Sequence, residues 1–217
     1  MLRFFIFYCV AAVGAVHDYR WQAWVDRPTG VAGSHETSLF HDKCMPTRHV
    51  VESFIGYPEW LASPRVSFGF LQARPCFDGG ADVKLFGIWS VLRFGRHRLS
   101  RTERRIKTER WTEETVTIPM LGGFMVGHPA RGSLLFSVMQ SQTGVHKLET
   151  QIVHGYNPAL CGRPPVSRIR ASSYRCTQSL LHAYVMWRFH NRVASKAECE
   201  SGRTSRLRGR HNPRRNR

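Results

Sequence analysis

The chain has 217 residues, 42% of them hydrophobic and 22% charged, and this usage excludes general disorder. A chain of this length can bury one sizeable core, so we expect a single domain over residues 17–200. The net charge of +17 comes from 27 Arg and 5 Lys against 15 acidic residues. It favours an acidic partner such as nucleic acid or an anionic membrane surface, although a solvated basic tail has the same composition.

Residues 1–16 have two interpretations. Arg3 precedes the apolar run from Phe4 to Val13, and small residues follow at Gly14 and Ala15, which is the layout of a secretory signal peptide. The run is also rich in strand formers and equally predicts a buried first strand. The protein is secreted in the first case and cytoplasmic in the second, so its localisation stays open.

The first half of the expected domain begins without regular structure. Residues 17–44 contain Pro28, Gly and Ser breakers and two tryptophans, Trp21 and Trp24, and this mixture predicts an irregular segment. Pro46 and Thr47 then open a helical pattern that Gly56 and Pro58 end. A second short helical turn is expected over residues 59–61.

Strand patterns fill the middle of the chain. Val66, Phe68 and Phe70 alternate, and the apolar run from Val83 to Phe94 predicts one long strand. Residues 101–119 are rich in Thr, Arg and Glu and predict a long exposed strand. Residues 133–142 and 145–153 flank a turn at Gly144, and together they predict a β-hairpin.

From about Arg168 to Ala194 the chain lacks Gly and Pro and predicts a long amphipathic helix. Its polar face is expected to carry Arg175, His182, Arg188, His190 and Arg192. Residues 201–217 contain seven Arg and no acid, and this tail is expected to be disordered. The expected apolar face consists of Ile169, Cys176, Leu180, Tyr184 and Trp187 beside Leu181, Val185, Phe189 and Val193.

This order of elements predicts an α+β fold. Consecutive strands favour antiparallel pairing, so we expect a curved antiparallel sheet wrapped around the long C-terminal helix, a helix-grip arrangement. Because a sheet that grips a helix leaves a cleft beneath it, the arrangement also predicts room for an apolar ligand.

Several segments resemble the StART-like helix-grip superfamily, also called SRPBCC. The segment from Pro46 to Trp60 is similar to its early helix pair, and Gly132–Phe136, the Gly144 turn and Lys147–Val153 are similar to its late hairpin. The resemblance covers about residues 40–195. It implies a helix-grip fold, and since the superfamily includes lipid carriers, cyclases and binding modules, it implies no single reaction.

A narrower likeness is to the uncharacterised protein family 0548, a StART-related group. Gly87–Ser90 and Gly127–Gly132 carry this similarity. The chain departs from the pattern after Gly132, where Ser133 and Leu134 stand in place of an expected acidic pair.

Catalytic and metal-binding signatures are missing from the sequence. Between Glu114 and Glu198 the only acidic residue is Glu149, which argues against a two-carboxylate glycosidase. No phosphate-binding or dinucleotide-binding loop and no nucleophile elbow is present. The six cysteines and eleven histidines show no metal-ligand spacing, so the sequence predicts no cofactor and no metal. The scattered cysteines fit reduced, partly buried thiols or, in an extracellular protein, an oxidised pair.

The leading hypothesis is binding or transport of a hydrophobic or amphipathic small molecule in the cleft beneath the C-terminal helix. The alternative interpretation places the candidate aromatic residues in an ordinary core and His128 in a turn. The candidate ligand-binding residues are Trp89, Trp111, His128, Phe136, Tyr184 and Trp187.

Two other functions stay open at this point. The first is binding of nucleic acid or another anionic surface. The expected anion-binding residues are Arg203, Arg206, Arg208 and Arg210 in the tail, and residues 93–110 would add to the binding. The second is a small cofactor-free enzyme such as a cyclase, using His128, Tyr184 or Glu149.

Overall fold

The computed structural model describes residues 16–41, 47–106, 109–127 and 132–210, without side chains after Lys196. Within these ranges nine strands form one antiparallel sheet in the order β1-β2-β9-β8-β7-β5-β4-β3, with β6 paired to β7. They are β1 (His17–Val25), β2 (Ala32–His41), β3 (Leu71–Pro75), β4 (Ala81–Leu85), β5 (Trp89–Phe94), β6 (Arg98–Ile106), β7 (Glu109–Gly122), β8 (Ser133–Ser141) and β9 (Val145–Val153).

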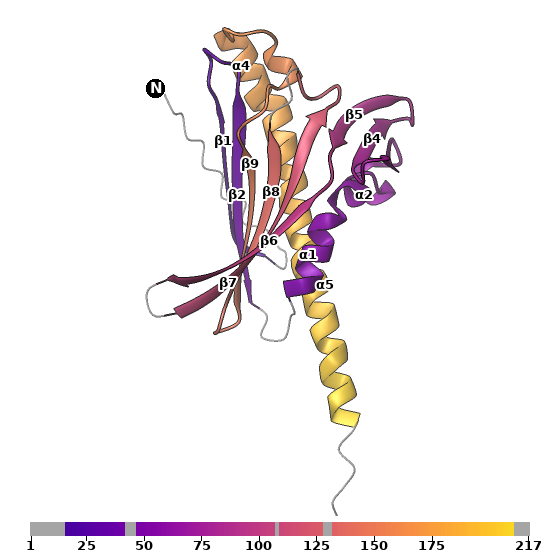
Figure 1. The fold of residues 1–217 in the computed structure, drawn as a ribbon, viewed down its shortest axis with the longest axis vertical. Helices are drawn as coiled ribbons and strands as arrows, with labels where there is room; N and C mark the ends of the chain where they lie inside the picture. Colours follow the sequence, from indigo (N-terminus) through magenta and orange to yellow (C-terminus); the bar gives the residue numbers. More distant parts are fainter. Residues whose placement is uncertain (1–15, 42–46, 107–108, 128–131, 211–217) are drawn as a thin grey trace, which may run out of the picture.

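Helices cover one face of this sheet (Figure 1). Ser167 Oγ accepts a hydrogen bond from the backbone N–H of Arg170, and this cap starts the C-terminal helical segment. The segment consists of α4 (Arg168–Tyr174), a π-helical turn η2 (Arg175–Ser179) and α5 (Leu180–Arg210). The chain therefore has the expected α+β helix-grip arrangement. The short helices are α1 (Thr47–Ile55), α2 (Tyr57–Leu61), α3 (Pro64–Ser67) and the 3₁₀ turn η1 (Ala159–Cys161).

An aromatic cluster fills the core between α1, α2, β8 and α5. The Phe136 ring lies 5.2 Å from Phe54, 5.1 Å from Tyr57 and 5.4 Å from Phe189, measured between ring centroids. Buried residues alternate with more exposed ones along the whole of β9. This alternation is the period of a strand with one face on the core, and it confirms the predicted hairpin of β8 and β9.

The prediction of an irregular segment over residues 17–44 is wrong for its described part, which forms strands β1 and β2. Tyr19 and Trp21 are buried. Gly33 is needed opposite Trp24, because a Cβ on Gly33 would overlap the indole ring. The Gly and Ser residues that suggest a loop are therefore accommodated inside the strand pair.

Three strand predictions need correction, whereas both short helices, α1 and α2, are confirmed. Residues 64–67 form α3, so the Val66–Phe70 strand is wrong. The apolar run from Val83 to Phe94 is two strands, since the turn at Phe86 and Gly87 interrupts it. The expected single strand over 101–119 is the β6–β7 hairpin, in which Arg101 and Glu114 form an ion pair of 3.7 Å.

The predicted helix from Arg168 is confirmed, but its expected faces are partly wrong. Ile169, Leu180 and Tyr184 are exposed, while His182 and His190 point toward the sheet. For the residues beyond it, the cause is the π-helical turn, because its extra residue rotates the phase of the helix. Ile169 lies before this turn, in the first turn of α4.

The two ends of the chain leave several predictions open. Residues 1–15, where a signal peptide or first strand is expected, lie outside the described residues. The helical backbone of α5 runs through Arg210, and residues 211–217 are not described, so disorder over 201–217 stays a prediction. Among the described residues, no helix combines the length and apolar character that crossing a bilayer requires.

Candidate functional site

An apolar pocket of about 160 Å³ lies between the sheet and the start of α5. Strand residues form its floor and α5 forms part of its roof. Leu181 both lines the pocket and is largely exposed, so the pocket reaches the surface beside α5. Its lining consists of Tyr57, Leu61, Leu71, Val83, Val91, Leu92, Phe94, Met120, Met125, Val126, Leu134, Ile152, Tyr156, Gln178, Leu181, His182 and Val185.

Gln178 supplies a polar group to this apolar lining. Its Nε2 donates to the backbone oxygen of Met125 at 3.2 Å and to Tyr156 Oη at 3.4 Å. These two contacts fix the orientation of the amide, because the reversed amide would set its oxygen against the Met125 carbonyl. Gln178 Oε1 is buried and has no hydrogen-bond partner among the described residues. The pocket therefore contains an acceptor that lacks a donor.

The π-helical turn places Gln178 there. Of the five residues of η2, Gln178 and Ser179 are buried although both are polar. Single π-helical turns inside α-helices occur often at functional sites, because they redirect side chains at a cost in helix stability. Next to Gln178, the Tyr156 and Tyr174 hydroxyls lie 3.2 Å apart.

A second polar position at the pocket belongs to His182. Its Nε2 lies 3.0 Å from Ser34 Oγ and 3.2 Å from Glu36 Oε1 on β2. Both neighbours approach the same ring nitrogen, whereas a nucleophilic triad needs the hydroxyl and the carboxylate on opposite nitrogens. The group is thus a buried carboxylate beside a half-buried imidazole, with a hydroxyl next to it.

The Glu36 carboxylate is fully buried, and its Oε2 has no hydrogen-bond partner within the described ranges. Burial raises the pKa of the Tyr174 phenol to about 12, and the Glu36 charge adds to the rise. Burial and the same charge also raise the pKa of Tyr57. These phenols stay protonated and remain available as hydrogen-bond donors.

Farther along α5, His190 joins the helix to the sheet. Its Nδ1 lies 2.8 Å from Ser38 Oγ and its Nε2 lies 2.8 Å from Thr150 Oγ1. Burial lowers the pKa of His190 to about 3, so the ring is neutral at physiological pH. A neutral imidazole donates from one nitrogen and accepts at the other, which satisfies both hydroxyl contacts.

The structure disperses the residues predicted to bind a ligand, and none of the described ones lines the pocket. Phe136 is fully buried in the aromatic core. Trp89 and Tyr184 are exposed, and Trp187 packs beside Tyr19 and Trp21 on the other side of α5.

Trp111 is half-buried near the start of β7. His128 and the side chains of Arg203, Arg206, Arg208 and Arg210 lie outside the described residues.

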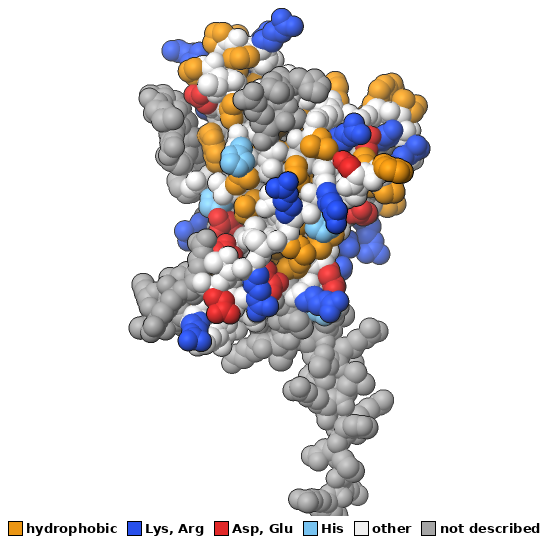
Figure 2. All heavy atoms as spheres, in the orientation of Figure 1, with side chains coloured by type: hydrophobic (Ala, Val, Ile, Leu, Met, Phe, Trp, Pro, Cys, Tyr) orange, Lys and Arg blue, Asp and Glu red, His pale blue; other side chains and the backbone are white. Residues whose placement is uncertain are grey.

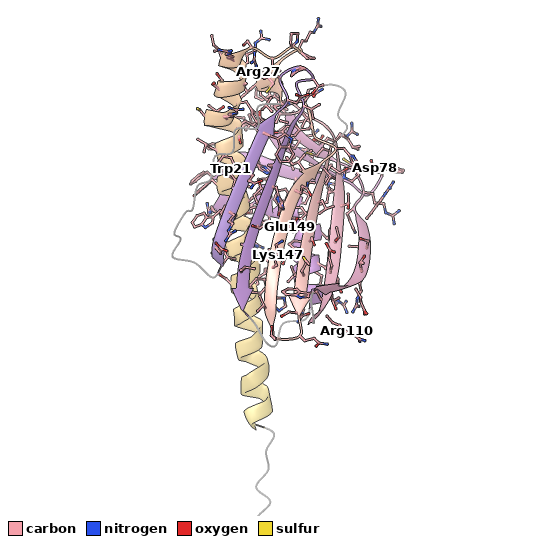
Figure 3. All side chains as sticks on the ribbon, turned by 90° about the vertical axis from the view of Figure 1, so that its left-hand side faces the viewer. Trp21, Arg27, Asp78, Arg110, Lys147 and Glu149 are labelled. Carbon is pink, nitrogen blue, oxygen red and sulfur yellow. The ribbon has the colours of Figure 1, made fainter. Side chains whose placement is uncertain are left out.

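Glu149, the carboxylate considered for an enzyme, is not in the cleft. Alternation along β9 puts it on the face opposite the buried Leu148 and Thr150 (Figure 3). There His35 lies 2.7 Å away and Lys147 3.0 Å away, and their hydrogen bonds lower the pKa of Glu149 to about 2.

Sequence reasoning missed Glu36, Gln178 and the inward position of His182. Two signals were available: a carboxylate between two serines in alternation on residues 34–38, and a Gln in the predicted amphipathic helix. Nowhere in the described ranges do three or more His, Cys, Asp or Glu side chains gather as they would around a metal ion.

Comparison with known proteins assigns the chain to no family, since no family model and no curated protein matches it. The resemblance to the StART-like superfamily therefore stays a prediction.

Proposed function

We propose that the protein binds a small amphipathic molecule in the pocket beneath α5. The observation that carries the proposal is the unpaired acceptor Oε1 of Gln178, a residue of the largely apolar lining. A buried acceptor without a donor costs about 1–3 kcal/mol, and a ligand hydroxyl or N–H group would recover that cost. The ligand class is thus an apolar body with one hydrogen-bond donor.

The size of the pocket limits the ligand. An apolar cavity of roughly 150 Å³ accommodates one benzene molecule, and this pocket is of similar volume, about 160 Å³. Since the pocket reaches the surface beside Leu181, a second ring or a short tail can extend outward. A fused two-ring alcohol such as 1-naphthol is a suitable probe.

Blocking the pocket entrance tests the proposal. In Leu181→Trp the larger indole occupies space at the pocket entrance that a ring of the ligand would need. We therefore expect 1-naphthol to bind at least ~10-fold more weakly in calorimetric titration. The matched control is Leu180→Trp, which adds the same bulk at an exposed neighbour that does not line the pocket. Equal affinity in both variants, or no binding by the unaltered protein, would refute the proposal.

Removing the acceptor tests the polar half of the proposal. In Gln178→Leu we expect the affinity for 1-naphthol to fall by about 1–3 kcal/mol, the cost of a lost buried hydrogen bond. Naphthalene, which has no hydroxyl, is expected to bind the variant at least as well as the unaltered protein. A parallel loss for both molecules would show that Gln178 acts only by supporting the fold.

A further inference from the structure

One end of strands β3, β4 and β5 carries a cluster of exposed large apolar side chains. Hydrogen bonds join its segments: Phe86 N donates to Phe70 O at 2.7 Å, and Phe124 N donates to Ser90 O at 2.7 Å. The Phe70 and Phe86 rings are 5.5 Å apart, edge to face. We call this cluster the apolar tip, and it consists of Phe68, Phe70, Phe86, Ile88, Trp89 and Phe124, each at least 52% exposed.

Two residues of the apolar tip adopt a backbone conformation that does not suit them. Phe68 has a φ of 54° and Phe86 a φ of 51°, both in the left-handed region. A bulky side chain is disfavoured there, whereas Asn or Gly would be easily accommodated. Burial does not offset this strain for either Phe, because both side chains are exposed. Strained, exposed aromatics at two separate turns suggest that they contact something outside the protein.

The segment of the chain that carries most of the apolar tip has an excess of positive charge. Between Ser63 and Gly95 the chain carries four basic residues against two acidic ones. Of the acids, Asp82 is engaged by Ser90 at 2.6 Å and by Lys84 at 3.7 Å. Lys and Arg side chains lie beside hydrophobic ones over the β4–β5 region (Figure 2). The four basic residues are Arg65, Arg74, Lys84 and Arg93.

We propose that the apolar tip inserts into the surface of a lipid bilayer that contains anionic headgroups. Its side chains come from separate turns, and Trp and Phe are the residues that favour the boundary between headgroups and acyl chains. The basic residues of α3 and of the same strands have the charge that attracts negative headgroups. The tip adjoins the pocket, because Leu71, Val91 and Met125 line the pocket from the same segments. Bilayer binding goes beyond the proposed function and does not depend on a ligand in the pocket.

A double variant tests this proposal with the full chain. Phe68→Asn and Phe86→Asn together remove two aromatics and relieve the backbone strain, so the melting temperature should not fall. In co-sedimentation with vesicles of phosphatidylcholine and phosphatidylserine, we expect the double variant to bind at least ~10-fold more weakly than the unaltered protein. Binding of the unaltered protein should also be stronger to these vesicles than to phosphatidylcholine alone, and salt should weaken it.

The matched control is Phe77→Asn. Phe77 is fully exposed but lies in the β3–β4 turn, at the opposite end of these strands, so its loss should leave vesicle binding unchanged. Equal binding by the double variant, or no vesicle binding by the unaltered protein, would overturn the proposal. A tip-dependent dimer in analytical ultracentrifugation without vesicle binding would also overturn it, and would identify the tip as a protein interface.

Discussion

Phe136→Ala is expected to lower the free energy of unfolding by about 3–5 kcal/mol, the usual cost of deleting a buried phenyl ring. The reason is its position at the centre of the aromatic core, fully buried between Phe54, Tyr57 and Phe189. Domains are stable by only about 5–15 kcal/mol, so the loss takes a large part of the total. Urea denaturation at neutral pH measures it.

Tyr184→Ala is the comparison, because Tyr184 was also predicted to contact a ligand yet is exposed on α5. Exposed substitutions usually change stability by less than about 0.5 kcal/mol. We expect the two variants to differ several-fold in their effect. If Phe136→Ala lost less than about 1 kcal/mol, Phe136 would not be a packed core residue, and its role in ligand binding would need to be considered again.

The sequence predicted the fold wherever hydrophobic periodicity was strong. The β8–β9 hairpin follows from two strand-like runs on either side of the Gly144 turn, and the C-terminal helix follows from a run without Gly or Pro. Together with the order of elements, these two predictions were enough for the helix-grip arrangement.

The first strand pair could not be predicted, since three successive inward-facing positions of β2 are polar. On β2 the buried residues include Ser34, Glu36 and Ser38, which alternate as a strand should but lack apolar side chains. Their partners, His182 and His190, come from a helix about 150 residues away. Hydrophobic periodicity carries no information about which polar side chains contact each other at that separation along the chain.

The pocket was expected in the correct place but with other residues. Of the aromatic candidates, Tyr184 and Trp187 lie on the expected helical stripe. The π-helical turn shifts that stripe, so these two face away from the pocket while Gln178 and His182 line it. A single extra residue in one turn is invisible to an average helical period. The predicted fold is therefore correct without the exact phase of the helix, whereas the predicted site residues depend on that phase.

The polar groups under the helix divide into two kinds. Gln178 and His182 line the pocket and are able to contact a ligand, whereas His190 is enclosed and already has two hydroxyl partners. The first two supply the polar contacts that the proposed amphipathic ligand would need. The third fixes α5 on β2 and β9, which keeps the pocket roof in place.

His190 also gives the protein a specific sensitivity to acid. Burial lowers the pKa of the folded-state ring to about 3, while in the unfolded chain it is near 6.5. Below about pH 6.5 the unfolded chain binds a proton at His190 that the folded protein does not bind. The contribution of the neutral ring to stability is therefore complete above that pH and decreases as the pH falls toward 3. The loss amounts to about 2 kcal/mol at pH 5.

His190→Gln removes this titration while keeping a donor and an acceptor between Ser38 and Thr150. Unfolding free energies of both proteins, measured by urea denaturation from pH 7 to 5, give the test, because Glu149 with its pKa of about 2 loses its contribution only at lower pH. We expect the unaltered protein to lose about 2 kcal/mol more than the variant over this range. The difference between the two curves cancels the other histidines and any constant offset. Parallel curves would mean that the folded protein protonates His190 as readily as the unfolded chain does, and that the ring is not sealed beneath α5.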